Sequence, residues 1–111
     1  MSRPIIYKMS DPESPSQDGD YTFTFTVPYG EVWEVLRVKG NSSLAYTSAQ
    51  ISVRASKEIR FAVDKLICLG YGFIYSKPFE VFGGDQIEIT FLNATTLETL
   101  QCGFQYRKKR G

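Results

Sequence analysis

The stretch that decides the fold runs from residue 21 to residue 40 and reads YTFTFTVPYGEVWEVLRVKG. Its first residues alternate, with aromatic or aliphatic side chains on one face and Thr22, Thr24 and Thr26 on the other. A period of two is typical of a β-strand with one face in a core and one in water. In VPYG, at residues 27–30, proline presets φ for a turn and glycine accepts the left-handed backbone that leads into the next strand. The stretch therefore predicts two strands joined by a tight turn.

The chain's one tryptophan, Trp33, follows this turn closely, and two roles compete for it. An indole ring can form a binding platform, or it can wedge the turn against the core. The apolar neighbours Val32, Val35 and Leu36 leave little room for Trp33 to face a ligand alone. We therefore expect a packing role.

Further short segments with the same alternation follow, and turn residues separate them. About eight short strands with few or no helices are the pattern of a β-sandwich or barrel, and eight strands in two antiparallel sheets form a jelly roll. The sequence therefore predicts an all-β, antiparallel β-sandwich that is jelly-roll-like. The expected strands lie at residues 21–27, 32–38, 45–54, 71–75, 79–81, 87–91 and 100–106, with one more within 56–70.

The segment at residues 56–70 fits two secondary structures. Its apolar residues at 59, 62, 63 and 66 have helical spacing, whereas those at 59, 61 and 63 alternate as in a strand. Because the other periodic segments have a period of two, and layers of one kind pack most simply, we favour a strand broken near Asp64 and Lys65.

Three parts of different character follow one another along the chain. Residues 1–20 are rich in Pro, Ser and Asp, and we expect an irregular N-terminal arm. Residues 21–106 are the expected sandwich domain, and residues 107–111 are a basic tail. The apolar patch at residues 4–7 either folds back on its own domain or lies in a groove of a neighbour. A terminal basic run is more often solvated than bound to nucleic acid.

The composition excludes several classes of function. The chain of 111 residues contains no histidine, which removes Ser-His-Asp and Cys-His catalysis and the commonest metal ligand. No phosphate loop, dinucleotide fingerprint, or zinc or calcium loop is present, and we expect no cofactor.

The sequence has neither a bilayer-spanning apolar stretch nor the apolar core of a secretory signal, so we expect no membrane partner. Cys68 and Cys102 are expected to be reduced, buried thiols, with a disulfide between them as the alternative.

Three acidic residues, Glu80, Asp85 and Glu88, lie close in sequence, and a glycoside hydrolase needs only two carboxylates, about 5–10 Å apart. However, Asp85 follows two glycines, where it caps a turn, and Glu88 alternates with isoleucines as an outward residue. We therefore expect no enzyme activity.

A group of aromatic residues, Tyr71, Phe73 and Tyr75, raises the question of a binding face. Most aromatic side chains in a sandwich of this size belong to the core. If these three face outward instead, a sugar or a protein partner can stack on them.

Two motifs carry a family resemblance. The first is Val-Pro-x-Gly, a charged residue and x-Trp-x-Val-Leu at residues 27–36, and the second is Pro-Phe-x-Val-x-Gly-Gly-Asp-x-Ile at residues 78–87. Together with the chain length and the absence of histidine, they resemble the small β-sandwich head-decoration proteins of tailed bacteriophages, such as the staple proteins of epsilon-type Salmonella phages. The resemblance covers most of residues 21–106 and concerns turn and core positions, so it transfers no functional residue.

The resemblance implies a structural role in the virion. Proteins of this kind bind the outer surface of the capsid and cement or staple neighbouring major capsid subunits. We expect a homodimer or higher assembly there, with no nucleic acid as a partner. A carbohydrate-binding or host-adhesion module of a phage is the alternative on the same fold. The expected partner-binding residues belong to the arm and the tail: Ile5, Ile6, Tyr7, Arg107, Lys108, Lys109 and Arg110.

Overall fold

The computed structural model describes residues 3–44, 48–56, 58–66 and 70–110. Within these ranges the chain is all-β, and no helix is present that could cross a membrane. The strands are β1 (Ile6–Met9), β2 (Gly19–Thr26), β3 (Val32–Ser42), β4 (Ser48–Ala55), β5 (Glu58–Leu66), β6 (Gly72–Tyr75), β7 (Phe79–Phe82), β8 (Gln86–Ala94) and β9 (Leu100–Arg110).

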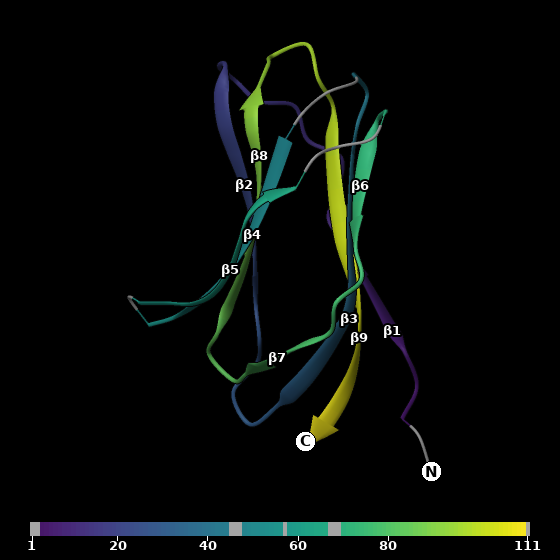
Figure 1. Cartoon of the computed structure of the whole chain (residues 1–111), viewed down its shortest axis with the longest axis vertical. Coiled ribbons are helices and arrows are strands. Elements are labelled where there is room, and N and C mark those ends of the chain that lie inside the picture. Colours follow the sequence, from purple (N-terminus) through teal and green to yellow (C-terminus); the bar gives the residue numbers. More distant parts are fainter. Residues whose placement is uncertain (1–2, 45–47, 57, 67–69, 111) are drawn as a thin grey trace.

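The strands form two antiparallel sheets that face each other as a sandwich (Figure 1). Sheet A has the order β1-β9-β3-β6, with β7 also paired to β3, and sheet B has the order β2-β8-β4-β5. Because β6 and β7 pair with successive parts of β3, they share one position beside it. Every connection except β4 to β5 and β6 to β7 passes from one sheet to the other. This winding is that of a jelly roll, so the predicted fold is confirmed.

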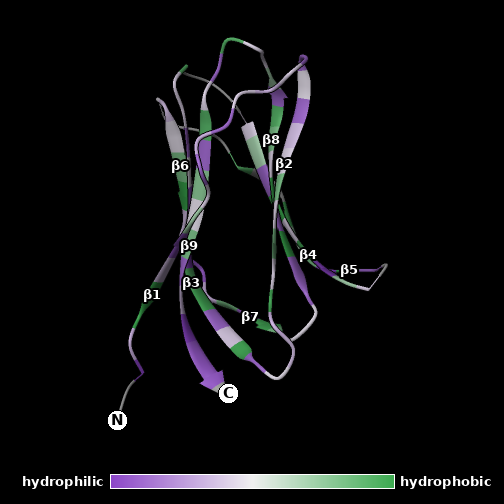
Figure 2. Ribbon diagram, turned by 180° about the vertical axis from the view of Figure 1, so that it is seen from behind, coloured by the Kyte–Doolittle hydropathy of each residue, from purple (hydrophilic) through white to green (hydrophobic). Residues whose placement is uncertain are grey.

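The core lies between the sheets and consists of alternate side chains from each strand. Apolar and polar residues alternate along several of the ribbons in Figure 2. In β2 and the residue after it, Phe23 and Val27 are buried and the threonines are exposed, as the alternation predicts. Phe25 meets Phe104 of the other sheet edge-on, with ring centroids 5.1 Å apart. Contacts of this kind join the two sheets into one apolar core.

The turn between β2 and β3 is confirmed. The Glu31 N–H donates to the Pro28 carbonyl at 3.2 Å, and Gly30 has a φ of 87°, which favours glycine. The strand that follows contains a feature absent from the prediction. Val35 pairs with Tyr106 and Arg37 pairs with Gln105, so Leu36 is an extra residue that forms a bulge.

The bulge changes which side chains of β3 face the core. Trp33 and Val35 point inward before it, and Val38 points inward after it, although an unbroken alternation would turn Val38 outward. Trp33 is 3% exposed and stacks on Tyr106, with ring centroids 3.9 Å apart. The expected packing role of Trp33 is therefore confirmed.

The ambiguous segment is a strand, β5, paired with β4. The expected break near Asp64 and Lys65 is wrong, because the strand continues to Leu66. Ala49 pairs with Leu66 and Ile51 with Val63, so β5 holds an extra residue here, and a bulge takes the place of a break. Residues 67–69, including Cys68 and its expected thiol or disulfide, lie outside the described residues.

The first and last strands, β1 and β9, both belong to sheet A. The segment expected to be an irregular arm contains β1, which pairs along β9 from Ile6 opposite Tyr106 to Met9 opposite Gly103. Of the two alternatives for the apolar patch, folding back on its own domain is the one observed. The segment expected to be a tail continues β9 as far as Arg110, because β3 supplies backbone partners along this length.

Candidate partner-binding surface

Large apolar side chains are exposed at β1 and at β6, on the outer side of sheet A. The exposed fractions are 53% for Ile5, 61% for Tyr7, 51% for Met9 and 62% for Ile74. Tyr7 and Met9 alternate with Ile6, which is half buried and packs against the core. We call Ile5, Tyr7, Met9 and Ile74 the apolar surface of sheet A.

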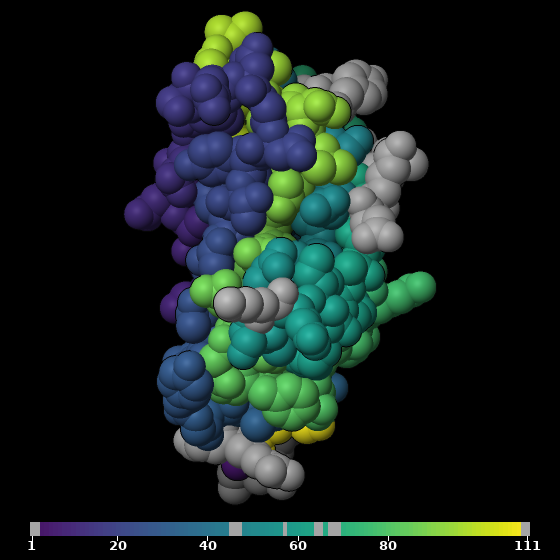
Figure 3. Space-filling model, turned by 90° about the vertical axis from the view of Figure 1, so that its left-hand side faces the viewer, coloured from purple at the N-terminus to yellow at the C-terminus, as the bar shows by residue number. Residues whose placement is uncertain are grey.

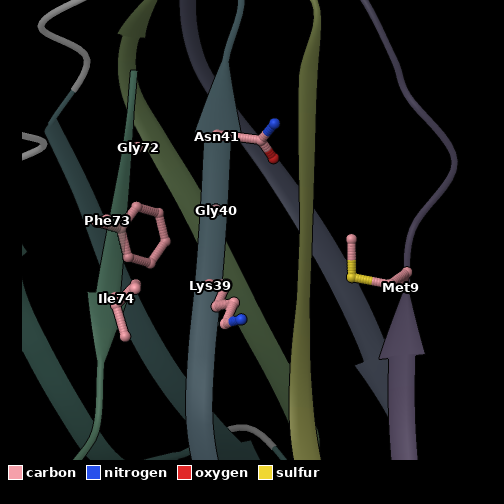
Figure 4. Close-up of a pocket in the computed structure, with 7 residues that line it drawn as sticks. All are labelled: Met9, Lys39, Gly40, Asn41, Gly72, Phe73 and Ile74. Atoms are coloured by element: carbon pink, nitrogen blue, oxygen red, sulfur yellow. The ribbon is translucent and has the colours of Figure 1, made fainter. Parts of the chain in front are cut away.

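Met9 and Ile74 of this surface line a pocket of about 490 Å³ (Figure 4). Met9 of β1 stands on one side of it, Phe73 and Ile74 of β6 stand on the other, and β3 runs between them. Its remaining lining comes from Lys39, Gly40, Asn41 and Gly72. The pocket therefore spans the width of the sheet and is mostly apolar.

Two glycines of sheet A leave room for neighbouring groups on opposite sides of the sheet. On the core side, a Cβ atom at Gly40 would collide with the buried ring of Phe73. On the outer side, a Cβ atom at Gly103 of β9 would collide with the Lys8 carbonyl oxygen and the Met9 sulfur. Gly103 thus lets β1 approach β9 and lets the Met9 side chain lie across the sheet.

Tyr7 is held in place although most of its ring is exposed. The side-chain amide of Gln105 donates to the Tyr7 hydroxyl, and the Lys39 ammonium lies 6.0 Å from the centroid of the ring. A cation at this distance over an aromatic face is weakly attracted to it. The apolar surface is therefore preorganised and has a positive charge beside it.

The structure brings the two expected partner-binding segments together. Because β1 and β9 are antiparallel, Tyr7 lies opposite Gln105, and the patch runs toward the basic residues at 107–110. The basic residues, however, have partners within the domain. Arg107 lies 3.5 Å from Glu34 and Lys108 lies 3.4 Å from Glu31, while Lys109 contacts Glu80. Arg110 pairs with Val32 through the backbone register.

Glu31, just before β3, and Cys102 of β9 have shifted pKa values. The pKa of Glu31 is lowered, because the Trp33 indole N–H donates to its carboxylate at 2.7 Å and the charge of Lys108 lies nearby. Burial raises the pKa of the Cys102 thiol to about 12. Cys102 is thus a free, buried thiol, as expected, with little thiolate character.

The three acidic residues singled out in the sequence have separate partners. Asp85 is buried, accepts the Phe82 N–H at 2.8 Å and contacts Arg60, in keeping with the expected turn cap. Glu80 contacts Lys109, and Glu88 lies on the outer face of sheet B beside Arg54. Among the described residues, no group of acidic or cysteine side chains is arranged to hold a metal ion.

The aromatic face considered at residues 71–75 does not form. Phe73 is buried and Tyr75 packs against the core, whereas Tyr71 is exposed in the turn before β6. The outward residue of this strand is Ile74, which its alternation with Phe73 could have revealed. No sequence pattern could have placed Met9 and Lys39 at the pocket, because they meet there only through the pairing of strands that are distant in sequence.

Comparison with known proteins gives no family. No family model matches the chain, and no curated protein matches it in sequence. A solved structure described as "CBM4 structure and function" is similar over 93% of this chain and 71% of its own, with a TM-score of 0.43 and 10% identity. A likeness this distant carries no argument about ligand or role.

Proposed function

We propose that this protein is a structural component of a phage virion that binds the outer surface of the capsid and cements neighbouring major capsid subunits. The observation that supports the proposal is the apolar surface of sheet A, where Ile5, Tyr7, Met9 and Ile74 are exposed and Met9 and Ile74 line a pocket. Exposed apolar groups gathered in one region, with polar groups around them, favour a protein partner.

The mechanism is one of surface burial rather than chemistry. An apolar side chain of a capsid subunit would fill the pocket beside Ile74 and Met9, while Tyr7 supplies a large ring whose position is already fixed. Side chains that are ordered before binding lose little entropy when they become buried. Aromatic anchors of this kind carry much of the affinity of protein interfaces.

A staple also needs two points of attachment. A homodimer on a capsid two-fold axis would place two apolar surfaces on two neighbouring subunits, and their linked contacts would add through effective concentration. Each single contact can then be modest while the assembled head is strongly reinforced.

The test is binding to expanded heads that lack the protein. We expect purified protein to bind such heads and to raise the temperature at which they release DNA. Tyr7→Ser and Ile74→Ser should each weaken head binding by about tenfold, since each removes a large exposed apolar contact.

Two control variants remove similar groups elsewhere. Tyr29 is 88% exposed and Leu97 is 81% exposed, so Tyr29→Ser and Leu97→Ser match the two test variants in chemistry. They should leave head binding unchanged. Absence of binding by the native protein would sink the cement role, and equal losses in test and control variants would remove the apolar surface of sheet A from it.

The alternative expected from the sequence is a carbohydrate-binding or host-adhesion module. Its proposed aromatic face is not formed by Phe73 and Tyr75. A different region of the molecule has the chemistry that such a role requires.

A further inference from the structure

The outer face of sheet B carries a polar groove of about 540 Å³. Figure 3 looks onto this face, with β2 in blue on one side and the β4–β5 hairpin in teal toward the other. The floor comes from β8 and β4, and the walls come from β2 and β5. The volume lies within the range of small-molecule sites.

The fold creates the groove by bending one edge of the sheet. The end of β4 and the start of β5 project away from the sandwich in Figure 1. Register shifts between β4 and β5 mark bulges, which bend a strand and increase its twist. Ile59, 56% exposed, and Ala62 therefore form a short apolar wall opposite the threonines of β2.

Hydrogen bonds hold the floor in position. Glu88 Oε1 accepts the Ser52 hydroxyl at 3.2 Å and faces Arg54 Nε at 3.4 Å, and the Thr22 and Thr90 hydroxyls lie 2.8 Å apart. The side chain of Glu88 is 20% exposed. Both of these Glu88 contacts use Oε1, and within the described ranges Oε2 makes no hydrogen bond, so it remains available to a ligand in the groove.

We propose that this groove binds a neutral carbohydrate chain. Hydroxyls that donate and accept, together with a fixed carboxylate and guanidinium, match the vicinal hydroxyl groups of sugars. The apolar wall at Ile59 and Ala62 suits the C–H face of a sugar ring.

The charges and the surface chemistry disfavour other ligands. Among the described lining residues, Arg54 is basic and pairs with Glu88, and Asp20 is a second acidic residue, so this lining has no excess positive charge for phosphate or nucleic acid. The same residues do not form the row of apolar pockets that recognises the alternate side chains of an extended peptide. The inference does not depend on the cement role, because the two sites lie on different sheets.

The experiment is an NMR titration of the isolated protein with cellohexaose, xylohexaose, mannohexaose and maltohexaose. At least one of the four should shift the backbone amides of Thr22, Ser52, Glu88 and Thr90 in a saturable manner at millimolar concentration. Glu88→Gln and the exposed variant Thr22→Val should each weaken that binding by about tenfold, since each removes a hydrogen-bonding group from the site.

The matched control is Thr26→Val, which removes an outward hydroxyl of the same strand outside the groove. It should bind the sugar as the native protein does, and all three variants should still bind heads if the cement role holds. The proposal is overturned if none of the four sugars gives saturable shifts in the groove. It is also overturned if only heparin hexasaccharide or single-stranded DNA binds there, or if neither test variant weakens binding.

Discussion

The contact between Trp33 and Glu31 shows how one side chain serves packing and electrostatics together. The indole ring stacks on Tyr106, while its N–H donates to the Glu31 carboxylate. The folded state therefore holds the pKa of Glu31 below its usual value of 4.5. A lowered pKa contributes stability that is complete above about pH 4.5 and is lost as the pH falls through the folded-state pKa.

Replacing Trp33 with Phe separates these two functions. Trp33→Phe keeps an aromatic ring against Tyr106 but removes the donor, so the pKa of Glu31 should rise toward 4.5. Acid unfolding should then begin at a higher pH than in the native protein. A ¹³C NMR titration of the Glu31 carboxyl group measures the change directly.

Lys108→Gln provides the comparison, because the charge of Lys108 is a smaller cause of the same shift. It should raise the pKa of Glu31 by less than Trp33→Phe does. Identical Glu31 titrations in the native protein and in Trp33→Phe would contradict the assigned cause.

At the scale of elements, the attachment of β1 depends on one glycine of β9. Gly103 leaves the space in which the Lys8 carbonyl and the Met9 side chain lie. Gly103→Ala should therefore separate part of β1 from β9 and lower the free energy of unfolding by about 1–3 kcal/mol, as overpacking does. Urea denaturation measures this loss.

Thr26→Ala is the control, since Thr26 is an exposed residue of β2 outside both sites. Its free energy of unfolding should stay within about 0.5 kcal/mol of the native value. The account of β1 fails if Gly103→Ala is equally neutral.

The elements differ in how far the sequence predicts them. The alternation and the turn of residues 21–30 are local properties, so β2 and the start of β3 follow from the chain itself. The bulge at Leu36 and the pairing of β1 depend on β9, which is distant in sequence. For the same reason the folding back of residues 4–7 on their own domain was predictable only as one of two alternatives, and the position of Met9 was not predictable.

At the scale of the whole molecule, basic side chains at the end of β9 are paired with carboxylates of the same domain. The chain has a net charge of +1, and the basic end of β9 lies beside Glu31, Glu34 and Glu80. Exposed ion pairs of this kind contribute little stability, and they leave little charge for a long-range attraction.

Binding to heads should accordingly depend weakly on salt. We expect the dissociation constant to change by less than about threefold between about 50 and about 500 mM NaCl. Salt screens interactions between charges, whereas burial of apolar surface involves no charge to screen. Sedimentation of heads with labelled protein measures the dissociation constant. A steep loss of binding over this range would point to the basic residues rather than to the apolar surface of sheet A.

Both chain ends emerge at the same pole of the sandwich, while the loop from β8 to β9 lies at the opposite pole (Figure 1). A tag fused to either terminus would therefore lie near β1 and the apolar surface beside it. The opposite loop is the better place for foreign sequence, since Thr96 and Leu97 are exposed there and Glu98, beyond the insertion point, anchors the loop to β3 by accepting the Ser42 hydroxyl. An epitope inserted between Thr96 and Leu97 would be presented at the pole away from both termini, which makes this jelly roll a candidate scaffold for the display of foreign sequence.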